Sequence, residues 1–380
     1  MIYKTIEELT TVVTGGTPST SKAEYWENGN IPWLQSGCCQ NCDVNQADKF
    51  ISQSGYDNSS TQVMPVNTVM IALTGATAGK VGYLNIEACG NQSITGVFPC
   101  EELNPRFLFY FLISQRRKIL VDCVGGAQAH ISQGYEKKIK VPVYSKNLQE
   151  RIVNIMNICS KNIKHYEMIL KEYDELVKAR FVEMFGDPVS NSKHLPLKTL
   201  PQLGTFGRGV SKYRPRNAPE LLNGPYPLIQ TGDIANSELY IKNYNNTYSE
   251  VGLKQSKMWD KGTLCITIAA NIAKTAILQF DACFPDSVVG FNGNNLIDNI
   301  FVHYWFSFFQ EILENQAPES AQKNINLKIL SELQIITPDI IEQNQFANFV
   351  RQVDKSREEV KRSLEKTQKL YDSLMQEYFG

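Results

Sequence analysis

The chain has 380 residues, of which 42% are hydrophobic and 20% are charged, and its formal net charge is −1 at pH 7. A length above about 250–300 residues exceeds what one hydrophobic core usually fills, and the composition is that of a folded protein, which excludes a disordered chain. The charge excludes a uniformly basic nucleic-acid-binding protein, so any DNA binding must come from local patches such as 116–118 or 208–216.

The chain shows no targeting or membrane signal. No apolar run approaches the roughly 18–20 residues of a membrane span, and residues 1–10 are amphipathic, unlike a secretory signal peptide. We therefore expect a cytoplasmic protein. Its nine cysteines are scattered and odd in number, which is typical of reduced thiols and predicts no disulfide framework.

The first part of the chain is predicted to be a mixed α/β globule. Strands are expected at Ile31–Leu34, Thr68–Leu73 and Val81–Leu84, and a helix at about Pro105–Leu120. The connecting loops are rich in Gly, Ser, Thr, Asn and Gln. Such loops suit the reading of base edges, where Asn and Gln pair with adenine and Arg or Lys pairs with guanine.

The motifs of this globule that suggest chemistry do not complete a catalytic or metal site. The run GATAGKV at 75–81 has three residues between its glycines where a phosphate-binding loop needs four, so a turn between two strands is favoured, with Lys80 as a DNA phosphate contact. Cys38, Cys39 and Cys42 lack a second pair at zinc spacing, and the histidines are isolated. The Asn-Pro-Pro-Tyr or Asp-Pro-Pro-Tyr run of amino-methyltransferases is absent. The sequence therefore predicts no metal and no catalytic residue.

A long helix is predicted from about Asn147 to Phe185, because apolar residues recur every seven positions and Gly186 follows as a stop signal. A second helix with the same pattern is expected from about Glu342 to Phe379. About 35 residues at a rise of 1.5 Å make each helix roughly 50 Å long. Two such stripes indicate an antiparallel coiled coil, with its apolar side expected at Met156, Ile163, Leu170, Val177 and Met184, flanked by Ile155 and Leu176, and at Leu370 in the second helix.

The segment between the helices repeats the first globule. Strands are expected at Tyr226–Ile229, Thr263–Ile268 and Thr275–Leu278, with a helix at about Asn299–Leu313. A shift of 194 positions superposes the second half of the chain on the first, and upstream the shift becomes 195. Matching pairs are Ser93 and Ser287, Gly96 and Gly290, Phe107 and Phe301, Gly186 and Gly380, and, at the shift of 195, Gln35 and Gln230.

Two copies of a long repeat are too few for a solenoid and indicate two domains of like fold. We expect an α+β chain in which two similar mixed α/β domains alternate with two long helices, under an internal pseudo-two-fold repeat. The expected boundaries are 1–143 and 188–338 for the globules and 144–187 and 339–380 for the helices.

This order of segments resembles the specificity subunit of type I restriction-modification systems over essentially the whole chain. The resemblance is carried by TGGTPS, IPWLQSG, VMIALTGATAGKVG, NQSITGV, LQERIV and FVEMFGDP in the first half, and by PYPLIQTGD, TLCITIAANIAKTAI, DSVVGF and QEYFG in the second. No single run is specific, whereas their duplicated order between two long helices is distinctive.

The resemblance implies two target-recognition domains, each reading one half of a bipartite asymmetric site in double-stranded DNA, and helices that set the gap and dock the partner subunits. It implies that the chain has no catalysis and no cofactor of its own. Two modification (methyltransferase) subunits would transfer a methyl group from S-adenosylmethionine to adenine, and restriction (motor-nuclease) subunits would use ATP. Both cofactors are therefore expected on partner subunits only, and no membrane partner is expected.

Polar groups on the loops are the expected DNA contacts, and phosphate contacts should outnumber base contacts. One departure from the pattern is the second copy of the GATAGK turn, which reads ANIAK at 270–274 and puts a shared phosphate contact at that turn in doubt. The expected contacts are Thr17, Lys22, Gln35, Thr74, Lys80, Ser93 and Gln128 in the first domain, and Lys212, Arg214, Arg216, Gln230, Asn271, Lys274, Ser287 and Gln322 in the second.

Two other functions stay open from the sequence. The chain could be a DNA methyltransferase or nuclease whose active site the motifs do not reveal. It could also be a coiled-coil scaffold that does not bind DNA, for which the near-neutral charge is the main argument.

Overall fold

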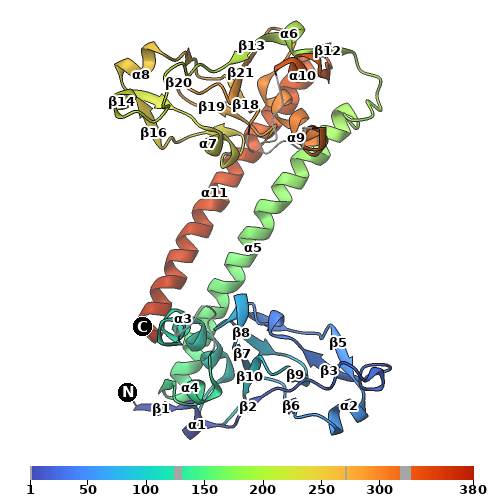
Figure 1. Cartoon of the computed structure of the whole chain (residues 1–380), viewed down its shortest axis with the longest axis vertical. Coiled ribbons are helices and arrows are strands. Elements are labelled where there is room, and N and C mark those ends of the chain that lie inside the picture. Colours follow the sequence, from blue (N-terminus) through green and yellow to red (C-terminus); the bar gives the residue numbers. More distant parts are fainter. Residues whose placement is uncertain (1, 124–130, 270–271, 317–326) are drawn as a thin grey trace. The chain divides into compact units, whose positions relative to one another are not determined.

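The computed structural model describes residues 2–123, 131–269, 272–316 and 327–380. The chain forms two compact units, of which unit 1 comprises Met1–Met168 with Lys361–Gly380 and unit 2 comprises Ile169–Val360 (Figure 1). Each unit contains one globule and a part of both long helices, α5 (Lys146–Phe185) and α11 (Ile340–Phe379). The domain boundaries expected from the sequence stay predictions.

Unit 1 is built on two main sheets. The five-stranded sheet has the order β2-β10-β7-β8-β4, the four-stranded sheet has the order β5-β3-β9-β6, and β1 pairs with β11 apart from both. The strands are β1 (Ile2–Thr5), β2 (Val12–Thr14), β3 (Ile31–Leu34), β4 (Cys42–Val44), β5 (Lys49–Ile51), β6 (Val63–Met64), β7 (Val69–Ala72), β8 (Val81–Leu84), β9 (Ala88–Gly90), β10 (Ile94–Val97) and β11 (Lys140–Val143). The helices are α1 (Ile6–Leu9), α2 (Gln53–Asp57), α3 (Pro105–Cys123) and α4 (Gln133–Lys137), with short 3₁₀ turns η1 (Ala23–Tyr25), η2 (Ser36–Cys38) and η3 (Gly75–Thr77).

Unit 2 repeats this topology strand for strand. Its sheets have the orders β13-β21-β18-β19-β15 and β16-β14-β20-β17, and β12 pairs with β22. The strands are β12 (Leu197–Thr199), β13 (Gly204–Arg208), β14 (Leu222–Leu228), β15 (Tyr240–Ile241), β16 (Asn246–Tyr248), β17 (Met258–Trp259), β18 (Leu264–Thr267), β19 (Thr275–Leu278), β20 (Ala282–Cys283), β21 (Val288–Gly293) and β22 (Gln334–Ile336). The helices are α6 (Leu200–Leu203), α7 (Thr231–Ala235), α8 (Glu250–Lys254), α9 (Asn299–Gln316) and α10 (Leu327–Glu332), with the turn η4 (Pro219–Leu221).

The register of the strands confirms the internal repeat. Gly96 of β10 lies opposite Met70 of β7, and its counterpart Gly290 of β21 lies opposite Cys265 of β18. The GATAGKV run forms the turn η3 between the antiparallel strands β7 and β8, as the sequence predicts. The two globules are therefore copies of one mixed α/β fold.

The long helices pack in opposite directions within each unit. In unit 1, Met156 near the start of α5 shares a core cluster with Phe379 at the end of α11. In unit 2, Phe181 near the end of α5 packs edge-on against Phe346 near the start of α11, with ring centroids 5.4 Å apart. The start of each helix thus meets the end of the other, which makes the pair an antiparallel coiled coil.

The apolar stripe of the helices is narrower than the sequence pattern predicts. Ile155, Leu176 and Leu370, which were expected on the packed side, are 37%, 47% and 52% exposed. Each helix has one partner helix, and away from the globules that partner covers only part of a wide apolar face. The seam positions Met156 and Val177 are buried as expected.

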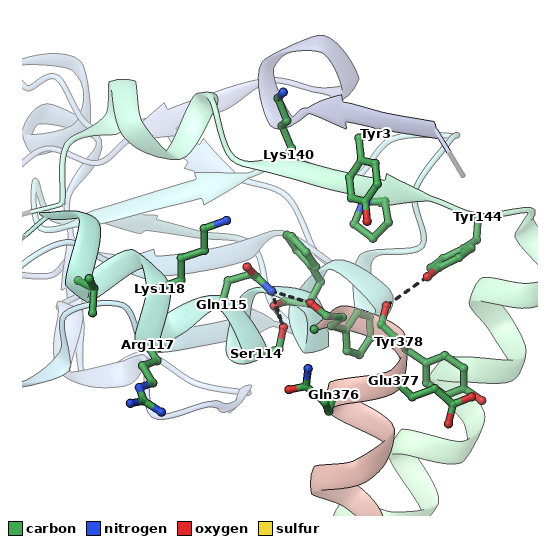
Figure 2. A pocket seen from close by; sticks show the side chains of 15 residues that line it. Tyr3, Ser114, Gln115, Arg117, Lys118, Lys140, Tyr144, Gln376, Glu377 and Tyr378 are labelled. Atoms are coloured by element: carbon green, nitrogen blue, oxygen red, sulfur yellow. Dashed lines mark hydrogen bonds between the residues drawn. The ribbon is translucent and has the colours of Figure 1, made fainter.

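The end of α11 fits into unit 1 beside α3 and the β1–β11 pair, next to a groove of about 800 Å³ (Figure 2). Gln115 Nε2 donates to the carbonyl oxygen of Phe379 (2.8 Å), and the Tyr144 hydroxyl donates to that of Tyr378 (3.2 Å). At the equivalent end of α5 in unit 2, Lys193 Nζ caps two carbonyl oxygens instead, at 2.8 Å each. The two helix ends therefore satisfy their free carbonyl groups with different side chains.

Two further properties bear on the expectations from composition. Among the described residues, no helix combines the length and the apolar character that a membrane span requires. The cysteines whose side chains the structure describes are all free thiols, and most are buried or half-buried.

Candidate nucleic-acid interface

The polar loops of unit 1 meet where β3, β7 and β10 end or begin. The backbone N–H of Asn91 donates to the carbonyl oxygen of Leu34 (2.9 Å). The backbone N–H of Leu73 donates to the carbonyl oxygen of Ser93 (2.9 Å). These bonds join the loop after β3, the turn after β7 and the loop before β10. Gln35 follows Leu34 and Thr74 follows Leu73, so both lie beside Ser93 at one edge of the globule.

A glycine brings a further loop to the same edge. A Cβ atom at Gly15 would overlap the carbonyl oxygen of Gly90, so only glycine lets the chain cross so closely after β2. The loop that follows contains Thr17 and Lys22. The Thr17 hydroxyl donates to Gln92 Oε1, next to Ser93.

The two lysines of this edge are both held by neighbouring side chains. Lys22 Nζ donates to the Tyr25 hydroxyl (2.8 Å) and lies 4.8 Å from the centre of the Tyr25 ring. Lys80 Nζ donates to Gln40 Oε1 (2.6 Å), on the loop that begins with Gln35. The structure thus brings together Thr17, Lys22, Gln35, Thr74, Lys80 and Ser93 on hydrogen-bonded loops, while Gln128 lies outside the described residues.

Unit 2 builds the same edge from the equivalent positions. Its crossing glycine is Gly209, where a Cβ would overlap the carbonyl oxygen of Phe284. The backbone N–H of Ile268 donates to the carbonyl oxygen of Ser287 (3.0 Å), which matches the bond between Leu73 and Ser93 in unit 1. Here the loops enclose a pocket of about 240 Å³, lined by Ser211, Arg216, Leu228, Gln230, Thr231, Tyr248, Pro285 and Ser287.

One carboxylate, that of Asp286, lies against two arginine side chains at this pocket. Asp286 accepts a hydrogen bond from Arg216 Nη2 at 2.5 Å and lies 3.6 Å from Arg214 Nη2. Arg214 also donates from Nη1 to the backbone carbonyl oxygens of Ser211 (2.6 Å) and Tyr213 (2.8 Å), so that it holds the shape of the loop.

Two other expected contacts of unit 2 lie on supported backbone. The amide of Lys212 is anchored to Gln255 Oε1 (2.7 Å), which leaves an exposed lysine on a fixed backbone. Lys274 is half-buried on the turn after β18, where its amide donates to the Thr267 hydroxyl (3.1 Å). That turn has Ala273 at φ 57°, where unit 1 has Gly79 at φ 72°. The two turns therefore share a backbone conformation although their sequences differ. Asn271 and Gln322 lie outside the described residues.

Sequence reasoning missed the side chains that hold the expected contacts in place, above all Asp286, Gln92 and Gln40. A signal for some of them was present in the repeat. The shift of 194 places Asp286 on Gln92 and Ser211 on Thr17, and the first of these two positions differs in charge between the copies.

Glu136 is a buried carboxyl group of unit 1, on α4. It is fully buried, and neither carboxyl oxygen has a hydrogen-bond partner among the described residues. Burial raises its pKa to about 8, an effect that the nearby Thr95 hydroxyl offsets only in part. The equivalent residue of unit 2 is Leu330, which is also buried.

Two of the three acidic groups that lie together in unit 2 form ion pairs. Within the described parts of the chain, Glu238, Asp354 and Glu358 are the one cluster with metal-ligand spacing. Arg357 Nη1 lies 3.6 Å from Glu238, and Lys242 Nζ lies 2.7 Å from Glu358. This arrangement is typical of an ion-pair network between a globule and a helix.

Comparison with known proteins gives the family. A family model described as the type I restriction modification DNA specificity domain matches residues 2–172 and again residues 199–367. The specificity subunit of the type I restriction enzyme EcoR124I/EcoR124II of Escherichia coli is 31% identical over 160 residues, which cover 41% of this chain and 40% of that protein. The MjaIX specificity subunit of Methanocaldococcus jannaschii is 24% identical over 199 residues, covering 50% and 45%. The alignments thus span less than half the length of these two relatives.

A solved structure supports the same fold. The crystal structure of a type I restriction-modification S subunit from M. genitalium superposes on 100% of this chain and 96% of that chain, with a TM-score of 0.65 at 16% identity. A structure of the type I system, described as showing complex assembly and conformational transition, gives a TM-score of 0.59 at 14% identity, covering 100% of this chain and 97% of that chain. The family model covers both halves of the chain, including both loop edges, and so the chain belongs to the type I restriction modification DNA specificity family.

Proposed function

We propose that this chain is the DNA-recognition subunit of a type I restriction-modification complex, in which each globule reads one half of a bipartite asymmetric site. The observation that supports it best is the duplicated loop edge. The same polar positions recur once in each unit, with Gln35 and Ser93 kept as Gln230 and Ser287, while the residue before this serine is neutral Gln92 in unit 1 and acidic Asp286 in unit 2. A duplicated scaffold with unlike recognition loops suits a site whose two halves have different sequences.

The long helices would set the distance between the half-sites. Each helix has 40 residues, which at a rise of 1.5 Å is roughly 60 Å. Half-sites one helical turn apart are separated by about 34–36 Å, which helices of this length span. The exposed apolar side chains Ile158 and Met168 on α5 offer a surface for docking methyltransferase subunits.

The chemistry is assigned to partner subunits. The chain would bind DNA without catalysing a reaction, with two modification subunits supplying methyl transfer from S-adenosylmethionine and restriction subunits supplying ATP-driven translocation and cleavage. The complex would act on cytoplasmic DNA. Supporting this division, the polar groups gathered at the loop edges are hydrogen-bond donors and acceptors suited to DNA, as in a binding protein.

Reconstitution tests the proposal against its two rivals. The purified chain, alone or with its methyltransferase subunits, is incubated with randomised duplex DNA and labelled S-adenosylmethionine. We expect selection of one bipartite motif and methyl transfer only when both proteins are present. Methyl transfer by the chain alone would show an enzyme, and DNA binding that is absent or insensitive to salt in the assembled complex would show a scaffold.

A further inference from the structure

The pocket at the loop edge of unit 2 has the side chains to recognise one particular base pair. We propose that it reads a guanine–cytosine pair in the major groove, with Arg216 donating to guanine and Asp286 positioning the guanidinium group. This inference rests on the proposed DNA-recognition function and names the base that unit 2 would select.

The geometry leaves Arg216 both fixed and available. Within the part of the chain that the structure describes, the Arg216 side chain hydrogen-bonds to Asp286 alone, through Nη2. A guanidinium group carries five N–H donors, and its two bidentate edges, Nη1–Nη2 and Nε–Nη2, share Nη2, so a single bond from Nη2 leaves one of these edges complete for a ligand. The Arg216 side chain is 47% exposed at the pocket, and its rotation is restricted by the bond to Asp286. A free edge with two parallel donors, on a guanidinium group whose rotation is restricted, suits a bidentate acceptor.

The carboxylate favours a neutral acceptor over a phosphate. A DNA phosphate at Arg216 would lie close to Asp286 and be repelled by it. Guanine presents two neutral acceptors, O6 and N7, side by side in the major groove, and the paired cytosine presents an amino group that a carboxylate can accept. One ion pair therefore offers complementary groups to both members of a G·C pair.

A buried hydroxyl adds unused hydrogen-bonding capacity to the pocket. Ser211 is 7% exposed, and its Oγ has no partner among the described residues, although it belongs to the pocket lining. A buried polar group without a partner is costly, and a ligand or ordered water that bonds to it recovers that cost. Gln230 and Ser287 line the same pocket from two other loops.

Unit 1 lacks this arrangement at the equivalent positions. Thr17 and Gln92 stand where unit 2 has Ser211 and Asp286, whereas Lys22, the N-cap of η1, corresponds to Ala218, the N-cap of η4, so unit 1 has no counterpart of Arg216. Thr17 bonds directly to Gln92, and Lys22 and Lys80 bond to the neutral side chains of Tyr25 and Gln40, so these residues form no guanidinium–carboxylate pair. The proposed guanine contact therefore belongs to unit 2 and distinguishes the two half-sites.

A chemical change in the DNA tests the contact directly. The motif bound by the reconstituted complex is determined first, and each guanine of both half-sites is then replaced in turn by 7-deazaguanine, which pairs normally and lacks the N7 acceptor. We expect one position in one half-site where the replacement weakens binding roughly 5- to 100-fold, the range of a bidentate base contact. With the Arg216→Gln variant, the same replacement should cause no further loss.

Two more variants separate a positioning role from a structural one. Asp286→Asn should reduce discrimination at that position and strengthen binding to DNA without the motif, because a negative charge near the phosphates is removed. A variant that merely damaged the loop would weaken both. Lys212→Gln, the matched control on the same loop, should weaken binding to all sequences alike and leave discrimination unchanged.

The possible results separate the guanine contact of Arg216 from the proposed DNA-recognition function. Half-sites without a G·C pair, insensitivity to 7-deazaguanine at every position, or undiminished sensitivity in Arg216→Gln would each overturn the inference while the DNA-recognition function stood. If the complex selected no motif at all, the proposed function would fail together with it.

Discussion

Replacing Glu136 by leucine should stabilise the protein, and the gain should grow with pH. Glu136 is fully buried on α4, and both of its carboxyl oxygens lack hydrogen-bond partners among the described residues. The repeat supplies the replacement, because Leu330 occupies the equivalent position in unit 2 and is itself buried. The substitution therefore puts into unit 1 a side chain that the same fold already accommodates.

The magnitude follows from the pKa of the buried carboxyl group. Burial raises the pKa of Glu136 from 4.5 to about 8. The unfolded chain releases this proton near pH 4.5 and the folded chain holds it to about pH 8, so the unfolded state binds fewer protons in this window and the free energy of unfolding falls as the pH rises through it. The difference of about 3.5 between the pKa values, at about 1.4 kcal/mol for each unit, corresponds to a loss of roughly 5 kcal/mol at most.

Calorimetric unfolding at pH 5.0 and pH 8.5 measures the effect. We expect the stabilisation by Glu136→Leu to be larger at pH 8.5 by roughly 3–5 kcal/mol, which for a unit of this size is on the order of 10 °C in the midpoint of its transition. The reciprocal variant Leu330→Glu is the matched control and should destabilise, more so at pH 8.5. Equal stabilisation by Glu136→Leu at both pH values would show that folding does not raise the pKa of Glu136.

Further predictions concern a turn, a phosphate contact and a helix end. Gly79→Ala should destabilise unit 1 by about 1–2 kcal/mol in thermal denaturation, because Gly79 has φ 72° and a Cβ there would lie 3.1 Å from Arg116 Cγ; an unchanged midpoint would contradict this. Lys80→Gln should weaken DNA binding at all sequences and reduce the slope of log affinity against log salt by about one, measured by titration at several salt concentrations; an unchanged slope would exclude a phosphate contact. Combining Gln115→Ala with Tyr144→Phe removes the side-chain donors to the last carbonyl groups of α11, so amide hydrogen exchange in 370–379 should accelerate. The control variant Lys193→Gln should accelerate exchange only at the end of α5.

Elements with strong local signals could be predicted from the sequence closely. The bounds of β3, β8 and β19 are those expected, and α5 and α11 extend from the expected ranges by a residue or two. Short apolar runs between turn residues and a long heptad stripe specify such elements locally. The antiparallel pairing of the helices also followed from the sequence, because two apolar stripes in one chain must cover each other.

Long-range and very short elements could not be predicted in this way. The strands β6, β17 and β20 have two residues each, too few to show any periodicity, and β1 pairs with a strand more than a hundred residues away. The exposure of Leu176 has a similar cause, since a stripe on one helix does not reveal how much of it the partner covers.

The sequence predicted which residues lie at the two loop edges, but it did not predict which of them contact one another. Gln230, Arg216 and Ser287 line one pocket, which their positions along the chain could not show. The bond between Arg216 and Asp286 joins residues 70 positions apart and depends on the close crossing at Gly209. Gln128, Asn271 and Gln322, which lie outside the described residues, stay predictions, as does the DNA-contact role of every residue in the set.

If this chain selects a bipartite DNA site, adenine methylation in the source cell should depend on its gene. Single-molecule methylome sequencing of the source cell, with and without this gene, tests it most directly, because it reports the recognised bases and their gap together. We expect adenine methylation at one two-part motif, with a fixed gap between unlike halves, to disappear with the gene and to return with a plasmid copy. Methylation at such a motif that persists without the gene, in a strain with no second copy of it, would show that another protein selects the site.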